Sequence, residues 1–70
     1  MLYQALELLQ YFKSLTQLDC RKNQLFSLPE LPDSLVKLDC SDNKLIYLPN
    51  KLPDNLIDLD CSNNQLSYLP

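Results

Sequence analysis

Apolar residues recur along most of this chain in an order that repeats about every twenty residues. Three copies of the order begin at Leu15, Leu35 and Leu56, so the spacing is 20 residues and then 21. Each copy reads Leu-x-x-Leu-Asp-Cys-x-x-Asn-x-Leu-x-x-Leu-Pro. A fixed period of this length indicates a repeat architecture, in which each copy buries its apolar face against its neighbours. We therefore predict an α/β solenoid of three copies within 14–70, at 15–34, 35–55 and 56–70, the last incomplete.

The centre of each copy alternates between apolar and polar positions. In the first copy, Leu18 and Cys20 point to one side, while Gln17, Asp19 and Arg21 point to the other. This two-residue period is typical of a β-strand. We predict one strand of about three residues in each copy, and we expect the strands to stack as a parallel sheet about 4.8 Å apart.

The second half of each copy returns the chain to the start of the next strand. It contains two Leu-Pro pairs, within 28–32 in the first copy and within 48–53 in the second. Proline fixes φ and disfavours helix at the preceding residue, so these returns should be extended and should form the convex side. The second copy has one extra residue, because Asn50-Lys51 stands where the first has Glu30.

Residues 1–13 lie outside the repeat and have a helical pattern. Leu2, Leu6, Leu9 and Phe12 are spaced by four, three and three residues, which places them on one helical face. We predict a helix within 1–13 that caps the apolar end of the solenoid. The alternative is an amphipathic helix that binds a membrane, but such a helix usually has a basic polar face.

Charge and composition limit the remaining choices. The net charge of −3 argues against nucleic acid as a partner, and no apolar run is long enough to span a membrane. We identify no signal peptide at the N-terminus. Three cysteines in register do not resemble a secreted disulfide framework. We therefore expect a cytoplasmic protein, in the producing cell or in a host cell.

The pattern Leu-x-x-Leu-x-Cys-x-x-Asn-x-Leu at 15–25, 35–45 and 56–66 resembles the leucine-rich repeat family. The Leu-Pro returns are similar to those of the short bacterial class found in secreted effectors of enteric pathogens. This resemblance implies a right-handed arc with the sheet on its concave face, and a role in binding proteins. Enzymatic members of that class carry a separate ubiquitin-ligase domain, which these 70 residues do not contain.

Two of the recurring positions have structural explanations. Cys20, Cys40 and Cys61 are spaced one per copy, which predicts a buried row and no metal site, because tetrahedral sites usually take ligands from closer spacings. The asparagines of the three copies form a second row, at 23, 43 and 64. Because the chain has no glycine for the tight turn after each strand, we expect these asparagines to adopt the turn geometry and to bind backbone groups of a neighbouring copy.

The outward-facing row of Asp19, Asp39 and Asp60 has two interpretations. It is either a solvated face or an acidic strip that binds a basic partner, and a flat row does not supply the converging oxygens that Ca²⁺ needs. Exposed aromatic residues before the Leu-Pro pairs suggest a contact patch or packing between copies. The candidate partner-binding residues are Gln17, Asp19, Arg21, Lys37, Asp39, Ser41, Asp58, Asp60, Ser62, Tyr47 and Tyr68.

No combination of residues in this chain is typical of catalysis. There is no histidine and no glycine, so neither a Ser-His pair nor a Gly-rich phosphate loop exists. We predict no enzymatic activity and no cofactor, and a protein-interaction module that binds a protein partner on its concave face. The alternative is an N-terminal structural fragment of a longer leucine-rich repeat protein, with its activity beyond Pro70. We also expect self-association through an uncapped C-terminal end.

Overall fold

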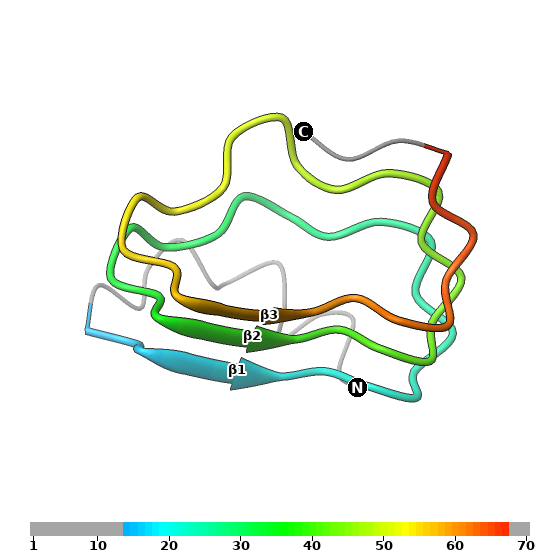
Figure 1. Cartoon of the computed structure of the whole chain (residues 1–70), viewed down its shortest axis with the longest axis horizontal. Coiled ribbons are helices and arrows are strands. Elements are labelled where there is room, and N and C mark those ends of the chain that lie inside the picture. Colours follow the sequence, from blue (N-terminus) through cyan, green and yellow to red (C-terminus); the bar gives the residue numbers. More distant parts are fainter. Residues whose placement is uncertain (1–13, 68–70) are drawn as a thin grey trace.

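The computed structural model describes residues 14–67, which form an open three-stranded parallel sheet (Figure 1). Strands β1 (Gln17–Asp19), β2 (Lys37–Asp39) and β3 (Asp58–Asp60) lie side by side in chain order. The predicted parallel strands of about three residues are therefore confirmed. The predicted N-terminal helix and Tyr68 lie outside the described residues.

The strands pair in the register that the sequence pattern predicts. Leu18 lies opposite Leu38, and Leu38 lies opposite Leu59. The pairing continues beyond the strand ends, since Cys20 N donates to Asp39 O and Cys40 N donates to Asp60 O, both at 2.9 Å. Equivalent residues of successive copies are therefore neighbours in space. We refer to 15–34 as copy one, 35–55 as copy two and 56–67 as the described part of copy three.

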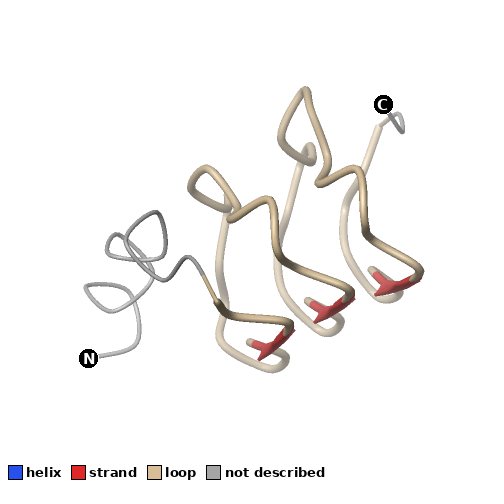
Figure 2. Ribbon diagram, turned by 90° about the vertical axis from the view of Figure 1, so that its left-hand side faces the viewer, coloured by secondary structure: helices blue, strands red, loops and turns tan. Residues whose placement is uncertain are grey.

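Each strand is joined to the next by a return that contains no helix within residues 14–67, as the prolines predict (Figure 2). Both complete returns end in a tight turn, in which Leu35 N donates to Pro32 O and Leu56 N donates to Pro53 O, each at 3.1 Å. The central residues of these turns are Asp-Ser and Asp-Asn, which favour turns because their side chains bind local backbone groups. The turns bring the chain back to the start of the next strand.

The apolar core lies between the sheet and the returns. Leu38 and Cys40 come from the sheet side, and Leu31, Leu35 and Leu48 come from the returns. The other buried members are Cys20, Leu25 and Leu45. The fully buried leucines all belong to copy two, because this copy has neighbours on both sides. Among their described equivalents in copies one and three, Leu25 is also buried, and the others are only partly buried against the core.

The turn after each strand requires left-handed backbone at the residue before the repeated asparagine. Lys22, Asp42 and Asn63 have φ of 60°, 55° and 55°. The expectation that the repeated asparagines adopt the turn geometry themselves is wrong. The side chains of these asparagines form hydrogen bonds instead. The positive φ falls on the residue before each of them, which is not β-branched and therefore accepts it.

The row of repeated asparagines connects successive copies. The Asn43 Oδ1 accepts from Asn23 N at 3.0 Å and from Leu25 N at 2.9 Å. Its Nδ2 donates to the carbonyl oxygens of Cys20, Cys40 and Ser41. Asn64 repeats the pattern one copy later, where it accepts from Leu45 N at 3.0 Å. The asparagines therefore satisfy backbone groups of the preceding copy as well as their own.

Candidate binding face of the sheet

The outward face of the sheet carries two complete rows of polar side chains. One row contains Gln17, Lys37 and Asp58, which pair across the strands, and the other contains three aspartates in register at 19, 39 and 60. Strand residues alternate between the two faces of a sheet, so the intervening leucines face the core. The predicted assignment of inward and outward positions is confirmed.

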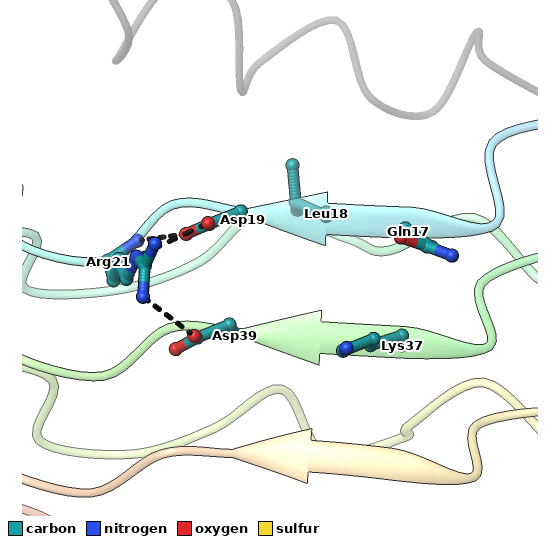
Figure 3. A pocket seen from close by; sticks show the side chains of 6 residues that line it. All are labelled: Gln17, Leu18, Asp19, Arg21, Lys37 and Asp39. Carbon is teal, nitrogen blue, oxygen red and sulfur yellow. Dashed lines mark hydrogen bonds and ion pairs between the residues drawn. The ribbon is translucent and has the colours of Figure 1, made fainter.

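Three ion pairs lie on this face, and two of them connect adjacent copies. The Arg21 Nε lies 3.3 Å from the Asp19 Oδ2, and one Arg21 terminal nitrogen lies 4.0 Å from the Asp39 Oδ2. Figure 3 shows the guanidinium of Arg21 between these two carboxylates. The Lys37 Nζ lies 3.9 Å from the Asp58 Oδ2. The two cations of the face are therefore both paired with carboxylates within the described part of the chain.

Each aspartate of the row also shapes the turn that follows its strand. The Asp39 Oδ1 accepts from the Ser41 backbone N–H at 3.1 Å and from the Ser41 hydroxyl at 2.7 Å. Asp60 and Ser62 repeat this pair of hydrogen bonds, and Asp19 accepts from the Arg21 backbone N–H at 3.2 Å. The row is therefore part of the strand ends as well as of the surface.

The pKa of Asp39 lies below its ordinary value. The main cause is the Ser41 hydroxyl that donates to its carboxylate, followed by the Ser41 backbone N–H. The charges of Arg21 and Lys37 act in the same direction. Asp39 is therefore ionised at neutral pH, and it carries a full negative charge beside the carboxylates of its neighbours.

A shallow groove of about 430 Å³ opens on the β1–β2 half of the face. Figure 3 shows the side chains that line it, which are Gln17, Leu18, Asp19, Arg21, Lys37 and Asp39. Two cations and two carboxylates line the groove, so their charges balance. The groove offers polar contacts and one apolar side chain, and no buried pair of reactive groups.

The structure brings most of the predicted binding residues together, but not all of them. Tyr47 is exposed, but it belongs to the return of copy two and does not line the groove. Ser41 is buried, and its hydroxyl donates to the Asp39 carboxylate. Ile57 is 85% exposed and was not among the predicted residues. Ile57 is apolar where copy one has the polar Thr16, and this difference was the signal that could have indicated an exposed apolar residue at position 57.

The three cysteines form the expected row, but one of them is less buried than predicted. Cys20 and Cys40 are fully buried, whereas Cys61 is half-buried, and none forms a disulfide. Burial raises the pKa of the Cys20 thiol to about 11 and that of the Cys40 thiol to about 12. Among the described residues, no cluster of three or more His, Cys, Asp or Glu side chains is arranged to hold a metal ion.

Comparisons of this chain with protein-family models, with curated proteins and with solved structures found no match. Within residues 14–67, no helix has the length and apolar character needed to cross a membrane.

Proposed function

We propose that this chain is a protein-interaction module of the leucine-rich repeat type, a right-handed solenoid that binds a protein partner on the concave face of its sheet. The observation that supports this proposal is the outward face, where side chains from three copies form aligned, solvent-exposed rows. The backbone beneath these rows is held by the row of repeated asparagines at 23, 43 and 64, which we call the asparagine ladder. A face of this kind presents side chains at fixed spacing, which suits recognition of an extended partner.

The core residues support an interaction role over catalysis. The Cys20 and Cys40 thiols are protonated at neutral pH because burial raises their pKa, so they are poor nucleophiles. The carboxylates of the face are occupied by turn hydrogen bonds and ion pairs. On this proposal the protein acts in the cytoplasm, without a cofactor, through its surface alone.

Site-specific photo-crosslinking tests the proposal. A photoreactive residue is placed at Lys37 on the sheet face, or at Lys51 on a return as the matched control, since both side chains are exposed lysines. We expect a discrete protein adduct in extract of the producing cell from position 37 and none from position 51. Adducts that form equally at both positions, or only at 51, would overturn the assignment of the sheet face. The absence of any adduct from position 37 would overturn the proposed function in that cell.

A further inference from the structure

The charge of the sheet face is distributed unevenly along the stack of copies. The whole face carries two cations against four carboxylates, so two negative charges are in excess. On the β1–β2 half, Arg21 and Lys37 balance Asp19 and Asp39. The third strand contributes Asp58 and Asp60 and no cation. Because Lys37 also lies 3.9 Å from Asp58, Asp60 is the carboxylate of β3 that has no ion pair within residues 14–67.

Copy one shows how a cation lies on this face. Asp19 and Asp39 are register partners on adjacent strands, and the guanidinium of Arg21 reaches both of them. Asp39 and Asp60 are register partners in the same way, one strand further along. The position equivalent to Arg21 is occupied by Ser41, whose short side chain binds Asp39 and carries no charge. Within residues 14–67, no lysine or arginine forms an ion pair with Asp60.

We infer that the sheet face docks an extended, cationic segment of the partner protein, with an arginine side chain placed across Asp39 and Asp60 as Arg21 is placed across Asp19 and Asp39. This inference rests on the proposed function, and it names the chemistry of the partner. Charge complementarity supports it, because a cation at β3 relieves the repulsion between carboxylates that face each other on neighbouring strands. A planar guanidinium matches two carboxylates better than a compact ammonium does, since its donors form a fixed fork.

The groove beside β1 and β2 is consistent with an extended segment. It lies next to the Asp39–Asp60 pair and shares Asp39 with it. Adjacent strands are about 4.8 Å apart and same-face side chains of an extended segment are about 7 Å apart, so when one side chain lies over β2 and β3, the next lies near the β1 side of the groove. The arginine of the partner segment would lie over β2 and β3. The uncharged side chains next to it would enter the groove, where the charges of the lining residues already balance.

Titration of the isotopically labelled chain with short peptides tests this inference. The probes are an acetylated and amidated peptide with one arginine between serines, and the same peptide with citrulline, which keeps the shape and removes the charge. We expect the arginine peptide to shift the backbone amide signals of Ser41, Asp60 and Ser62 in a saturable way. We expect the citrulline peptide to have at most a fifth of that effect. Equal shifts from both peptides, no shift, or shifts centred on the acidic residues of the returns would overturn the inference.

Three variants extend the titration. Asp60→Asn should weaken binding of the arginine peptide by about twofold to fivefold, which lies within the range for one exposed ion pair, and Asp54→Asn on a return should leave it unchanged. Ser41→Arg should fill the position from within the chain and abolish the shifts. Copy one already accepts arginine in this position, with the backbone hydrogen bond to the aspartate kept. If Ser41→Arg fails to fold, the Asp60→Asn and Asp54→Asn pair still decides the outcome.

The two proposals fail in different ways. Crosslinks from position 37 combined with no preference for the arginine peptide would leave the interaction module in place and remove the cationic segment. Saturable arginine binding without a crosslinked protein from position 37 would remove the proposed function, because the face would then bind an isolated cation only.

Discussion

Copies two and three share the repeated leucines, cysteine and asparagine, and yet the burial of these residues differs. Leu45 is completely buried and its equivalent Leu66 is only partly buried. Cys40 and Cys61 differ in the same way. Copy two has a sheet neighbour on each side, whereas the only sheet neighbour of copy three is copy two within residues 14–67. Burial in this fold therefore depends on the neighbouring copies more than on the residue itself.

Substitutions in the asparagine ladder should show the difference between copies two and three most strongly. Asn43→Ala removes the acceptor for two backbone N–H groups, of Asn23 and Leu25, whereas Asn64→Ala removes the acceptor for one. At about 1–3 kcal/mol for each orphaned group, we expect losses of roughly 2–6 and 1–3 kcal/mol in the free energy of unfolding. Chemical denaturation followed by circular dichroism measures both. Asn55→Ala is the control, since its exposed amide makes one long hydrogen bond of 3.3 Å. Equal losses at 43 and 64 would contradict the ladder as described.

Truncation of equivalent leucines should also destabilise copy two more than copy three, with slightly smaller losses in the free energy of unfolding. Leu45→Ala removes a fully buried side chain and should cost about 2–5 kcal/mol in the free energy of unfolding, since the core cannot collapse fully around the cavity. Leu66→Ala removes a half-buried side chain and should cost about half as much, because part of it already contacts water. Thermal unfolding of the two variants compares them directly. A larger loss at Leu66 would mean that copy three is more tightly packed than its burial indicates.

Thiol reactivity also separates the two copies. Single-cysteine variants should react with a soluble disulfide reagent fastest at Cys61 and slowest at Cys40, because the reagent must reach the sulfur as a thiolate. The raised pKa values also predict loss of stability at high pH. The thiols keep their protons in the folded state up to about 11 and 12, and the unfolded chain releases them from about 9. Stability should therefore fall as the pH rises from about 9 towards 12.

The alkaline effect has its own control. Replacement of Cys20 and Cys40 by alanine removes both titrating groups, so the remaining fall in stability between pH 9 and 11 should be smaller than in the parent chain. An unchanged fall would assign the effect to the tyrosines or lysines. Labelling of Cys40 as fast as Cys61 would contradict its burial.

The aspartate row should have the smallest effect on folding. Replacement of Asp19, Asp39 and Asp60 by asparagine keeps an Oδ1 acceptor for the turn hydrogen bonds and removes the repulsion between the carboxylates. The ion pairs that are lost are exposed, so we expect a change within about 1 kcal/mol in the free energy of unfolding. Denaturation at neutral pH measures it. Unfolding of the triple variant would show that the row is a structural requirement.

The repeated leucines, cysteines and asparagines carried enough information to predict the strands, their parallel order and the two faces of the sheet. The alternation of Leu18 and Cys20 with Asp19 sets the inward and outward sides, and the common period sets the register. The left-handed position was assigned to the wrong residue, because asparagine tolerates that conformation well. The chain instead places Lys22 or Asp42 there, since the asparagine side chain is needed for the ladder.

The composition and spacing of the chain established that equivalent residues of successive copies are neighbours, because a period of 20 or 21 residues packs the leucines of each copy against those of the next. The spatial arrangement added what no single copy contains. It joined Arg21 to a carboxylate of the next copy, left Asp60 without a cation within residues 14–67, and buried Cys40 more deeply than Cys61. These differences arise between copies, where side-chain reach and the number of neighbours decide burial and charge pairing.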